Sequence, residues 1–216
     1  MAHQHHIAHR DKVASYVAGA AQEGGGPQAW DHLRSALPAH CHVLLTAPAD
    51  VLAVCLQGTL ARPLVEELSY EYESRYGEFY QQDGGPREMD KYAPELFSPA
   101  QGGNFVLLLR DGQAIGGGAF RRHDDPDTAE LKRVWTHSAL RRQGLAGRVL
   151  QELEDQALRQ GYARLYLTTG FRQPEAVGLY LRHGYTALFD TSLPHETYRH
   201  LPFEKWLRVA ALARAA

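Results

Sequence analysis

Residues 128–169 contain a strand, a helix and a second strand with only short connections between them. The segments "TAELKRVWTH" (128–137) and "ARLYLTT" (163–169) have the β-branched, alternating character of strands. Between them, apolar residues recur at helical spacing from Leu145 to about Gln160. Strands that flank one helix this closely are expected to lie parallel, joined by a right-handed crossover. The unit therefore predicts an α/β chain whose sheet contains a parallel pair.

The remaining pattern places further strands and helices on both sides of this unit. We expect strands at 42–47, 104–112, 113–124, 185–190 and 202–209, and helices at 59–77 and 173–183. The Asp111-Gly112 dipeptide is typical of a two-residue hairpin, so the strands beside it should be antiparallel. Gly161 and Gly184 each follow a helix, where a left-handed residue commonly ends it.

Residues 1–40 differ in character from the rest of the chain. They are polar at the start, glycine-rich near the middle, and contain four early histidines. These histidines could bind a metal, but no fixed spacing on an ordered element is evident, so a solvated tail is favoured. We expect an N-terminal extension of uncertain order over 1–40 and one folded domain over 41–216.

Charge and cysteine content narrow the class of protein. The formal net charge is −2, which gives no general attraction to nucleic acid. The longest apolar run is broken by Pro48 and Asp50 and is too short to span a bilayer. Two cysteines, Cys41 and Cys55, are too few for a disulfide framework. We therefore expect a cytoplasmic protein without a nucleic-acid or membrane partner.

The segment "LRRQGLAGRVL" (140–150) places arginines and small residues at the beginning of a helix. Unpaired N–H groups and the helix dipole favour an anion there, and glycine lets a phosphate approach the backbone. Tight packing of a strand against the helix would explain the glycines equally well. Signatures of P-loop and dinucleotide-binding sites, of zinc sites and of a serine nucleophile elbow are all missing, so we expect no metal.

Two longer stretches resemble a known superfamily. "AELKRVWTHSALRRQGLAGRVLQELEDQAL" resembles motif A of the GNAT N-acetyltransferases, with Arg141, Gly144 and Ala146 at the three fixed positions of R/Q-x-x-G-x-G/A. "LYLTTGFRQPEAVGLYLRHGY" resembles their motif B. The resemblance implies a GNAT fold of the α+β type. Its central sheet is mixed and mostly antiparallel, contains a splayed parallel pair and is flanked by helices.

The resemblance also identifies the anion as the pyrophosphate of acetyl-CoA, the implied cosubstrate. Backbone N–H groups would bind it at Arg142, Gln143, Gly144, Leu145, Ala146 and Gly147, with Arg141 at the rim. The pantetheine arm would pair with the backbone of Val134 and Thr136 as an added strand does. Many members have Asn at the start of the motif B helix, where this chain has Gln173, whose amide is one methylene further from the backbone.

Three residues are catalytic candidates by the same resemblance. Glu130 would act as the general base, the Val134 N–H would stabilise the oxyanion, and Tyr180 would protonate the departing thiolate. The two-residue period of a strand predicts that Glu130 and Val134 point to the same face of the sheet. The alternatives are an ion pair of Glu130 with Lys132 or an arginine, and a packing role for the Tyr180 ring.

Acceptor specificity is expected from residues outside the two motifs. The candidates are Tyr70, Tyr72, Arg75, Tyr76, Arg121, Arg122 and His123, where arginines could bind a carboxylate or phosphate. We expect acetyl transfer to a primary amine of a small molecule or peptide in a ternary complex, and a homodimer is compatible with the sequence. A non-catalytic acyl-CoA sensor and a transferase of a longer acyl group are the alternatives.

Overall fold

The structure, a computed structural model, describes residues 43–46, 49–53, 59–84, 86–110 and 113–207. The predicted N-terminal extension, its four histidines and both cysteines lie outside the described residues. None of the described helices combines the length and the apolar character needed to cross a membrane.

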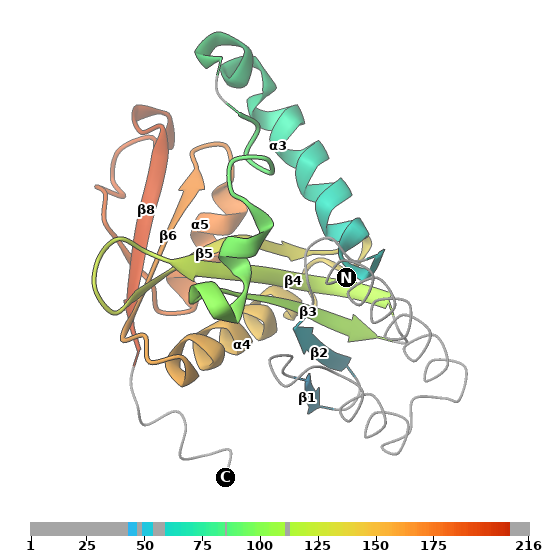
Figure 1. Cartoon of the computed structure of the whole chain (residues 1–216). Coiled ribbons are helices and arrows are strands. Elements are labelled where there is room, and N and C mark those ends of the chain that lie inside the picture. Colours follow the sequence, from blue (N-terminus) through green and yellow to red (C-terminus); the bar gives the residue numbers. More distant parts are fainter. Residues whose placement is uncertain (1–42, 47–48, 54–58, 85, 111–112, 208–216) are drawn as a thin grey trace.

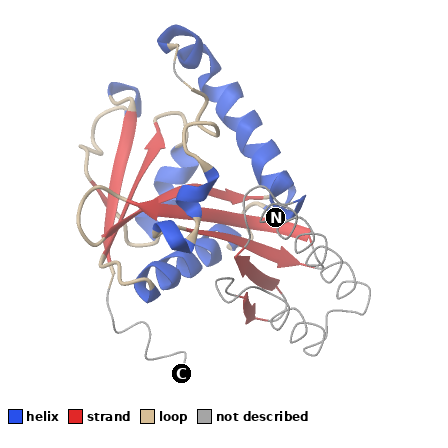
Figure 2. Ribbon diagram, in the orientation of Figure 1, coloured by secondary structure: helices blue, strands red, loops and turns tan. Residues whose placement is uncertain are grey.

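A mixed sheet of eight strands forms the centre of the molecule (Figure 1, Figure 2). The strands are β1 (Val43–Thr46), β2 (Ala49–Ala53), β3 (Asn104–Arg110), β4 (Gln113–Arg122), β5 (Thr128–Thr136), β6 (Arg164–Gly170), β7 (Thr186–Ala187) and β8 (His200–Trp206). Their spatial order is β1-β2-β3-β4-β5-β6-β8-β7. Within this sheet, β5 and β6 pair in parallel and the other neighbours are antiparallel. The predicted fold class is therefore confirmed.

Helices cover both faces of the sheet. The helices are α3 (Arg62–Asp83), α4 (Leu145–Arg159) and α5 (Pro174–Arg182), with short 3₁₀ turns η1 (Thr59–Ala61), η2 (Pro94–Phe97), η3 (Pro99–Gln101), η4 (Ser138–Leu140) and η5 (His195–Thr197). One hydrophobic cluster joins the sheet to α4 and α5, and it includes Val149, Leu153, Val177 and Tyr180. A second cluster, on the face that carries α3 and η2, includes Leu64, Leu68, Phe97 and Trp135.

Three consecutive glycines in β4 allow these helices to approach the sheet closely. A Cβ atom on Gly118 would lie 2.8 Å from Cδ1 of Leu153 in α4. A Cβ atom on Gly117, on the opposite face, would lie 2.8 Å from the Val106 carbonyl oxygen and 3.0 Å from Cδ1 of Leu64 in α3. The glycine run is thus a packing feature of the sheet.

Gly117→Ala is expected to destabilise the fold by about 1–3 kcal/mol, because the added methyl group meets backbone as well as side-chain atoms. In a chain of this size, each kcal/mol should lower Tm by roughly 2–4 °C. The matched control is Gly178→Ala in α5, where the Cβ would meet only the flexible end of Arg182. That change should leave Tm unchanged or raise it, because alanine favours helix. Equal Tm values for the two variants in thermal unfolding would contradict the packing argument.

Several element boundaries differ from the sequence expectations. Helix α3 continues past Gly77 and ends at Gly84, whose left-handed conformation (φ 62°) lets its N–H bond to the Tyr80 carbonyl oxygen. Strand β2 was not predicted. The strand expected over 185–190 is limited to β7, because Tyr185 belongs to the turn that ends α5 and donates its N–H to the Tyr180 carbonyl oxygen. Strand β8 begins two residues earlier than expected.

A β-bulge in β5 contradicts one further prediction. Gly117 pairs with Trp135 and Ala119 with Lys132, so two β5 residues oppose Gly118 alone. One of these two, Arg133, has a left-handed backbone (φ 58°). Beyond the bulge the alternation of side chains is reversed, and Val134 packs against the cluster of α4 and α5 while Trp135 lies in that of α3. The prediction that Glu130 and Val134 point to one face is therefore wrong.

Candidate active site

The beginning of α4 is open and uncapped, as an anion site requires. Gly144 precedes the helix in a left-handed conformation (φ 76°), and no side chain caps this end. A Cβ atom on Gly144 would meet nothing within 4 Å. Arg142 is also left-handed (φ 63°). The first-turn N–H groups lack intrahelical partners and lie at the positive end of the helix dipole.

Gly147, in the first turn of α4, has a different environment. A Cβ atom there would collide with Nε2 of His183 at the end of α5. The side chain of Leu145 is buried in the cluster of α4 and α5. Gly147 therefore serves helix packing, whereas Gly144 has open space beside it, and anion binding at Gly144 stays a prediction.

The parallel strands β5 and β6 separate part of the way along their length. Their pairing covers Thr128–Glu130 of β5 and Arg164–Tyr166 of β6, yet the strands continue to Thr136 and Gly170. Figure 1 shows the two strands diverging from this point. The edge of β5 from Leu131 to Thr136 therefore has no strand beside it on the β6 side, and this edge carries both Val134 and Thr136. We refer to the space between the diverging strands as the slot.

Tyr180 of α5 is buried, with 7% of its surface exposed. Its ring centroid lies 5.6 Å from that of Tyr185 and 5.5 Å from that of Phe203. Burial raises the pKa of the Tyr180 phenol, which therefore stays protonated. The phenol of Tyr72, on α3, is close enough for an electrostatic interaction with Tyr180, and burial together with nearby Glu88 raises the pKa of Tyr72 as well. Two protonated phenols, one from α5 and one from α3 on the opposite face of the sheet, are thus within electrostatic range of each other.

Glu130 is buried between two cations, with 5% of its surface exposed. Its Oε1 lies 2.8 Å from Lys132 Nζ, and its Oε2 lies 2.5 Å from Arg121 Nη2. The Arg121 contact is close but not aligned, so Oε2 has no hydrogen-bond partner among the described residues. Burial alone would lower the pKa of Lys132, but the Glu130 carboxylate outweighs it and raises that pKa. The predicted ion pair is therefore present with both cations, and the carboxylate is enclosed between them.

The Gln173 amide is engaged at both ends. Thr169 Oγ1 and the Gly170 N–H donate to its Oε1 over 3.1 and 3.2 Å, and its Nε2 donates to Glu71 Oε1 over 3.2 Å. These contacts order the turn between β6 and α5. The contact of Gln173 with the cosubstrate stays a prediction.

One face of α3 connects the segments around the slot. Glu67, Glu71 and Arg75 follow one another at intervals of four residues, which places them along one side of the helix. Glu67 accepts hydrogen bonds from Trp135 Nε1 and from the backbone and hydroxyl of Ser138, each over 2.9 Å. We call these three residues the α3 ladder, and its first member fixes the end of β5.

The other two members of the α3 ladder hold the loop and the β6–α5 turn. Glu71 lies 2.8 Å from Arg141 Nη2, as well as accepting from Gln173. Arg75 pairs with Glu175 over 2.5 Å and donates to the Arg172 carbonyl oxygen over 2.7 Å. Our sequence reasoning missed Glu67 and Glu71, although their spacing of four was a usable signal.

The seven predicted acceptor residues do not form one group. Tyr70 is 77% exposed. Tyr72 interacts electrostatically with Tyr180, and Arg121 pairs with Glu130, so each is linked to a candidate catalytic residue. Tyr76 accepts a hydrogen bond from the Arg172 N–H over 3.0 Å and so supports the β6–α5 turn. Arg122 and His123 line a separate cleft of about 650 Å³.

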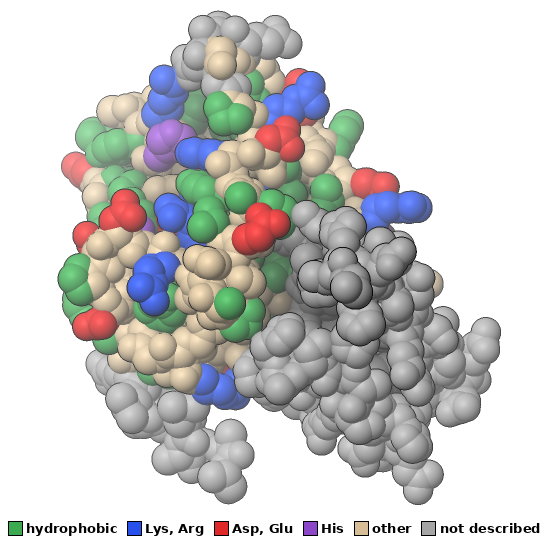
Figure 3. Space-filling view, in the orientation of Figure 1, with side chains coloured by type: hydrophobic (Ala, Val, Ile, Leu, Met, Phe, Trp, Pro, Cys, Tyr) green, Lys and Arg blue, Asp and Glu red, His purple; other side chains and the backbone are tan. Residues whose placement is uncertain are grey.

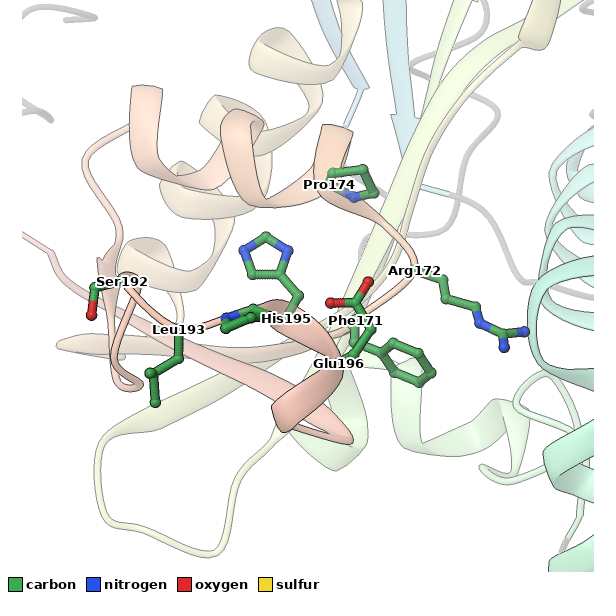
Figure 4. Close-up of a pocket in the computed structure, with 8 residues that line it drawn as sticks. Phe171, Arg172, Pro174, Ser192, Leu193, His195 and Glu196 are labelled. Atoms are coloured by element: carbon green, nitrogen blue, oxygen red, sulfur yellow. The ribbon is translucent and has the colours of Figure 1, made fainter.

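A further cleft lies between the β6–α5 turn and the segment that leads into β8 (Figure 4). Its volume is about 500 Å³, and its lining includes Phe171, Arg172, Pro174, His195 and Glu196. None of the predicted site residues lines it. In the described part of the chain, no group of three or more His, Cys, Asp or Glu side chains could hold a metal ion.

Comparisons with known proteins agree with this geometry. The family model described as "Acetyltransferase (GNAT) family" matches residues 65–185. A curated relative, the "IAA acetyltransferase" of Azospirillum brasilense, is 27% identical in an alignment of 111 positions that covers 45% of this chain and 72% of the relative.

Solved structures share the fold at low sequence identity. An acetyltransferase from Streptococcus agalactiae has a TM-score of 0.56 at 17% identity, over 75% of this chain and 100% of its own. The PaiA N-acetyltransferase of Thermoplasma acidophilum, solved in complex with coenzyme A, has a TM-score of 0.53 at 16% identity, over 73% of this chain and 98% of its own.

Proposed function

The chain belongs to the acetyltransferase (GNAT) family, and from this premise we propose that it transfers an acetyl group from acetyl-CoA to a primary amine. One observation carries the proposal. The unpaired edge of β5 leads directly to the uncapped beginning of α4, so an extended chain with an anion at one end fits the two features together. The pantetheine arm and the pyrophosphate of coenzyme A have this form.

The residues around the slot have the donors and acceptors that such a ligand needs. Backbone groups of Val134 and Thr136 would pair with the amides of the arm in the manner of an added strand. The N–H groups of residues 142–147 would surround the pyrophosphate. Arg141 would reach the phosphates by exchanging its contact with Glu71 for one with the ligand.

The chemistry would then divide among three groups. Oε2 of Glu130 accepts a proton from the acceptor ammonium, directly or through a water molecule, which frees the nitrogen lone pair to attack the thioester carbonyl carbon. The Val134 N–H, at the bulge, donates to the carbonyl oxygen as negative charge develops on it. Collapse of the adduct breaks the C–S bond. The nitrogen releases its second proton to solvent, and the departing sulfur, stabilised by a hydrogen bond from the Tyr180 hydroxyl, takes up a proton. The products are an amide and the free thiol of coenzyme A.

Two alternatives use the same slot. A non-catalytic sensor would bind acetyl-CoA without releasing thiol, and a transferase of a longer acyl group would prefer a longer thioester. Glu130 and Tyr180 favour catalysis over sensing, because a sensor needs neither a buried carboxylate nor a buried phenol that stays protonated.

Acetyl-CoA is expected to stabilise the protein against thermal unfolding. At about 100 times its Kd, ligand bound only by the folded state adds about 2.7 kcal/mol, which corresponds to roughly 5–11 °C in Tm for a chain of this size. Desulfo-CoA should give a similar shift and adenosine a smaller one, because adenosine lacks the pyrophosphate and the arm. Absence of any shift at millimolar acetyl-CoA would overturn the assignment of the slot. Thiol release with a panel of amines then separates enzyme from sensor.

A further inference from the structure

Three cations surround the ring of Tyr92, which lies in the segment between α3 and η2. The distances to the ring centroid are 4.8 Å from Arg121 Cζ, 5.0 Å from Lys132 Nζ and 5.5 Å from Lys91 Nζ. We call Lys91, Arg121 and Lys132 together with this ring the Tyr92 cluster. On the face that carries η2, Figure 3 shows Lys and Arg side chains beside a histidine. The cluster joins the η2 segment to β4 and β5.

The charges of the Tyr92 cluster are not fully balanced. Glu130 pairs with Arg121 and Lys132. Glu88 is the other carboxylate that acts on Lys132. Glu88 and Asp90 also act on the neighbouring Arg133, so four cations face three carboxylates. The Arg121 Nε–H is buried and has no hydrogen-bond partner among the described residues. An unsatisfied buried donor on a cation is costly, so an anionic acceptor would stabilise it.

His200, the first residue of β8, responds to the same positive charge. Partial burial and the neighbouring Lys91 lower its pKa, with further contributions from Arg199 and Lys132 that outweigh the opposing effect of Glu88. The imidazole is thus neutral at pH 7 and can donate a hydrogen bond without adding charge.

The exposure of the side chains decreases from one end of the Tyr92 cluster to the other. Lys91 is exposed, whereas the Arg121 and Lys132 side chains are 21% and 9% exposed, and Glu130 lies at the buried end. An acceptor that enters from the side of Lys91 therefore meets cations first and the candidate base last. Because Glu130 receives the amine under the proposed function, the group that precedes it at Lys91 and Arg121 should be an anion.

We propose that the acceptor is an amino acid or a related amine that carries a carboxylate, with the carboxylate bound by Lys91 and Arg121 beside His200 and the amine directed toward Glu130. This inference rests on the proposed function for the identity of the reacting amine. A carboxylate fits better than a second cation, which the cluster would repel, and a neutral acceptor would leave the excess charge and the Arg121 donor unmatched.

The kinetic test compares ω-amino acids with their carboxamides, in pairs whose amines have similar basicity. We expect kcat/KM from thiol release to be about tenfold or more higher for the carboxylates, the gain typical of a charge-assisted contact. Lys91→Gln should remove most of this preference and leave the KM for acetyl-CoA unchanged. The control Arg62→Gln removes an exposed cation on α3, remote from the cluster in sequence and paired with Glu66, and should preserve the preference. Equal kcat/KM for acids and amides would overturn the inference while the proposed function stands.

A binding test does not depend on turnover. N-acetylated ω-amino acids and their carboxamides are titrated by calorimetry into protein saturated with coenzyme A. The acids should bind about tenfold more tightly, and Lys91→Gln should abolish the difference. Selective binding of the acids without thiol release from any amine would reject the proposed transfer reaction but keep the anion site. Equal affinities would reject the anion site, whatever the activity.

Discussion

Glu130→Gln is expected to lower kcat for thiol release by about 10²- to 10⁴-fold, the range that a general base contributes. The amide keeps the size of the side chain and can still accept a hydrogen bond from Lys132, but it cannot take the proton of the acceptor ammonium. The acetyl-CoA-dependent rise in Tm should persist, because Glu130 precedes the unpaired edge of β5. Steady-state assays at saturating acetyl-CoA measure the change.

The matched control for this substitution is Glu204→Gln. Glu204 lies on β8 of the same sheet and pairs with Arg164 over 2.9 Å, so the control also removes a carboxylate from an arginine. The kcat of the Glu204→Gln variant should stay within a few-fold of the kcat of the unsubstituted protein. If Glu130→Gln lowers Tm but leaves kcat within threefold, the carboxylate serves only its ion pairs with Arg121 and Lys132.

Tyr180→Phe is expected to lower kcat about 10²-fold, at the lower end of the range for acid catalysis. The ring contacts with Tyr185 and Phe203 survive, so Tm should not change. The effect is limited because burial raises the pKa of the phenol, whereas a thiol has a pKa near 8.5. Full proton transfer to the thiolate is therefore uphill, and the hydroxyl acts chiefly by donating a hydrogen bond to the developing negative charge.

Tyr185→Phe is the control for Tyr180→Phe. It removes a hydroxyl that donates to Glu154 Oε1 over 3.1 Å, so it should lower Tm and preserve kcat. The pH profile adds a second criterion. Since its pKa is raised above 10, Tyr180 is protonated throughout the range below that value and should contribute no alkaline fall in kcat. An unchanged kcat in Tyr180→Phe would leave the residue with a packing role only.

Local patterns in the sequence predicted the scaffold of the site well. The strand–helix–strand unit, the start of α4 after Gly144 and the left-handed Gly161 all depend on neighbouring residues, and the structure confirms them. The strand expected at 185–190 is present only as β7, because the aromatic residues on either side of it pack against the cluster of α4 and α5 outside the strand.

The contacts that complete the site are between residues far apart in the chain. Glu71 meets Arg141 across 70 positions and Gln173 across 102. No local pattern specifies such pairs, although the four-residue spacing of charged residues on α3 indicated a polar face. The bulge in β5 could not be predicted from the sequence either. Its left-handed residue is Arg133, whereas a glycine is the usual sequence signal for that conformation.

The α3 ladder implies a reciprocity between the two substrates. Its three members attach one helix to the end of β5, to the loop before α4 and to the turn before α5, while Tyr72 of the same helix interacts electrostatically with the candidate acid Tyr180. An acceptor that displaces α3 must therefore change the affinity for the cosubstrate. By thermodynamic linkage, the cosubstrate changes the affinity for that acceptor by the same factor. With the role in acceptor binding predicted for α3, this helix would also set how strongly the two ligands favour each other.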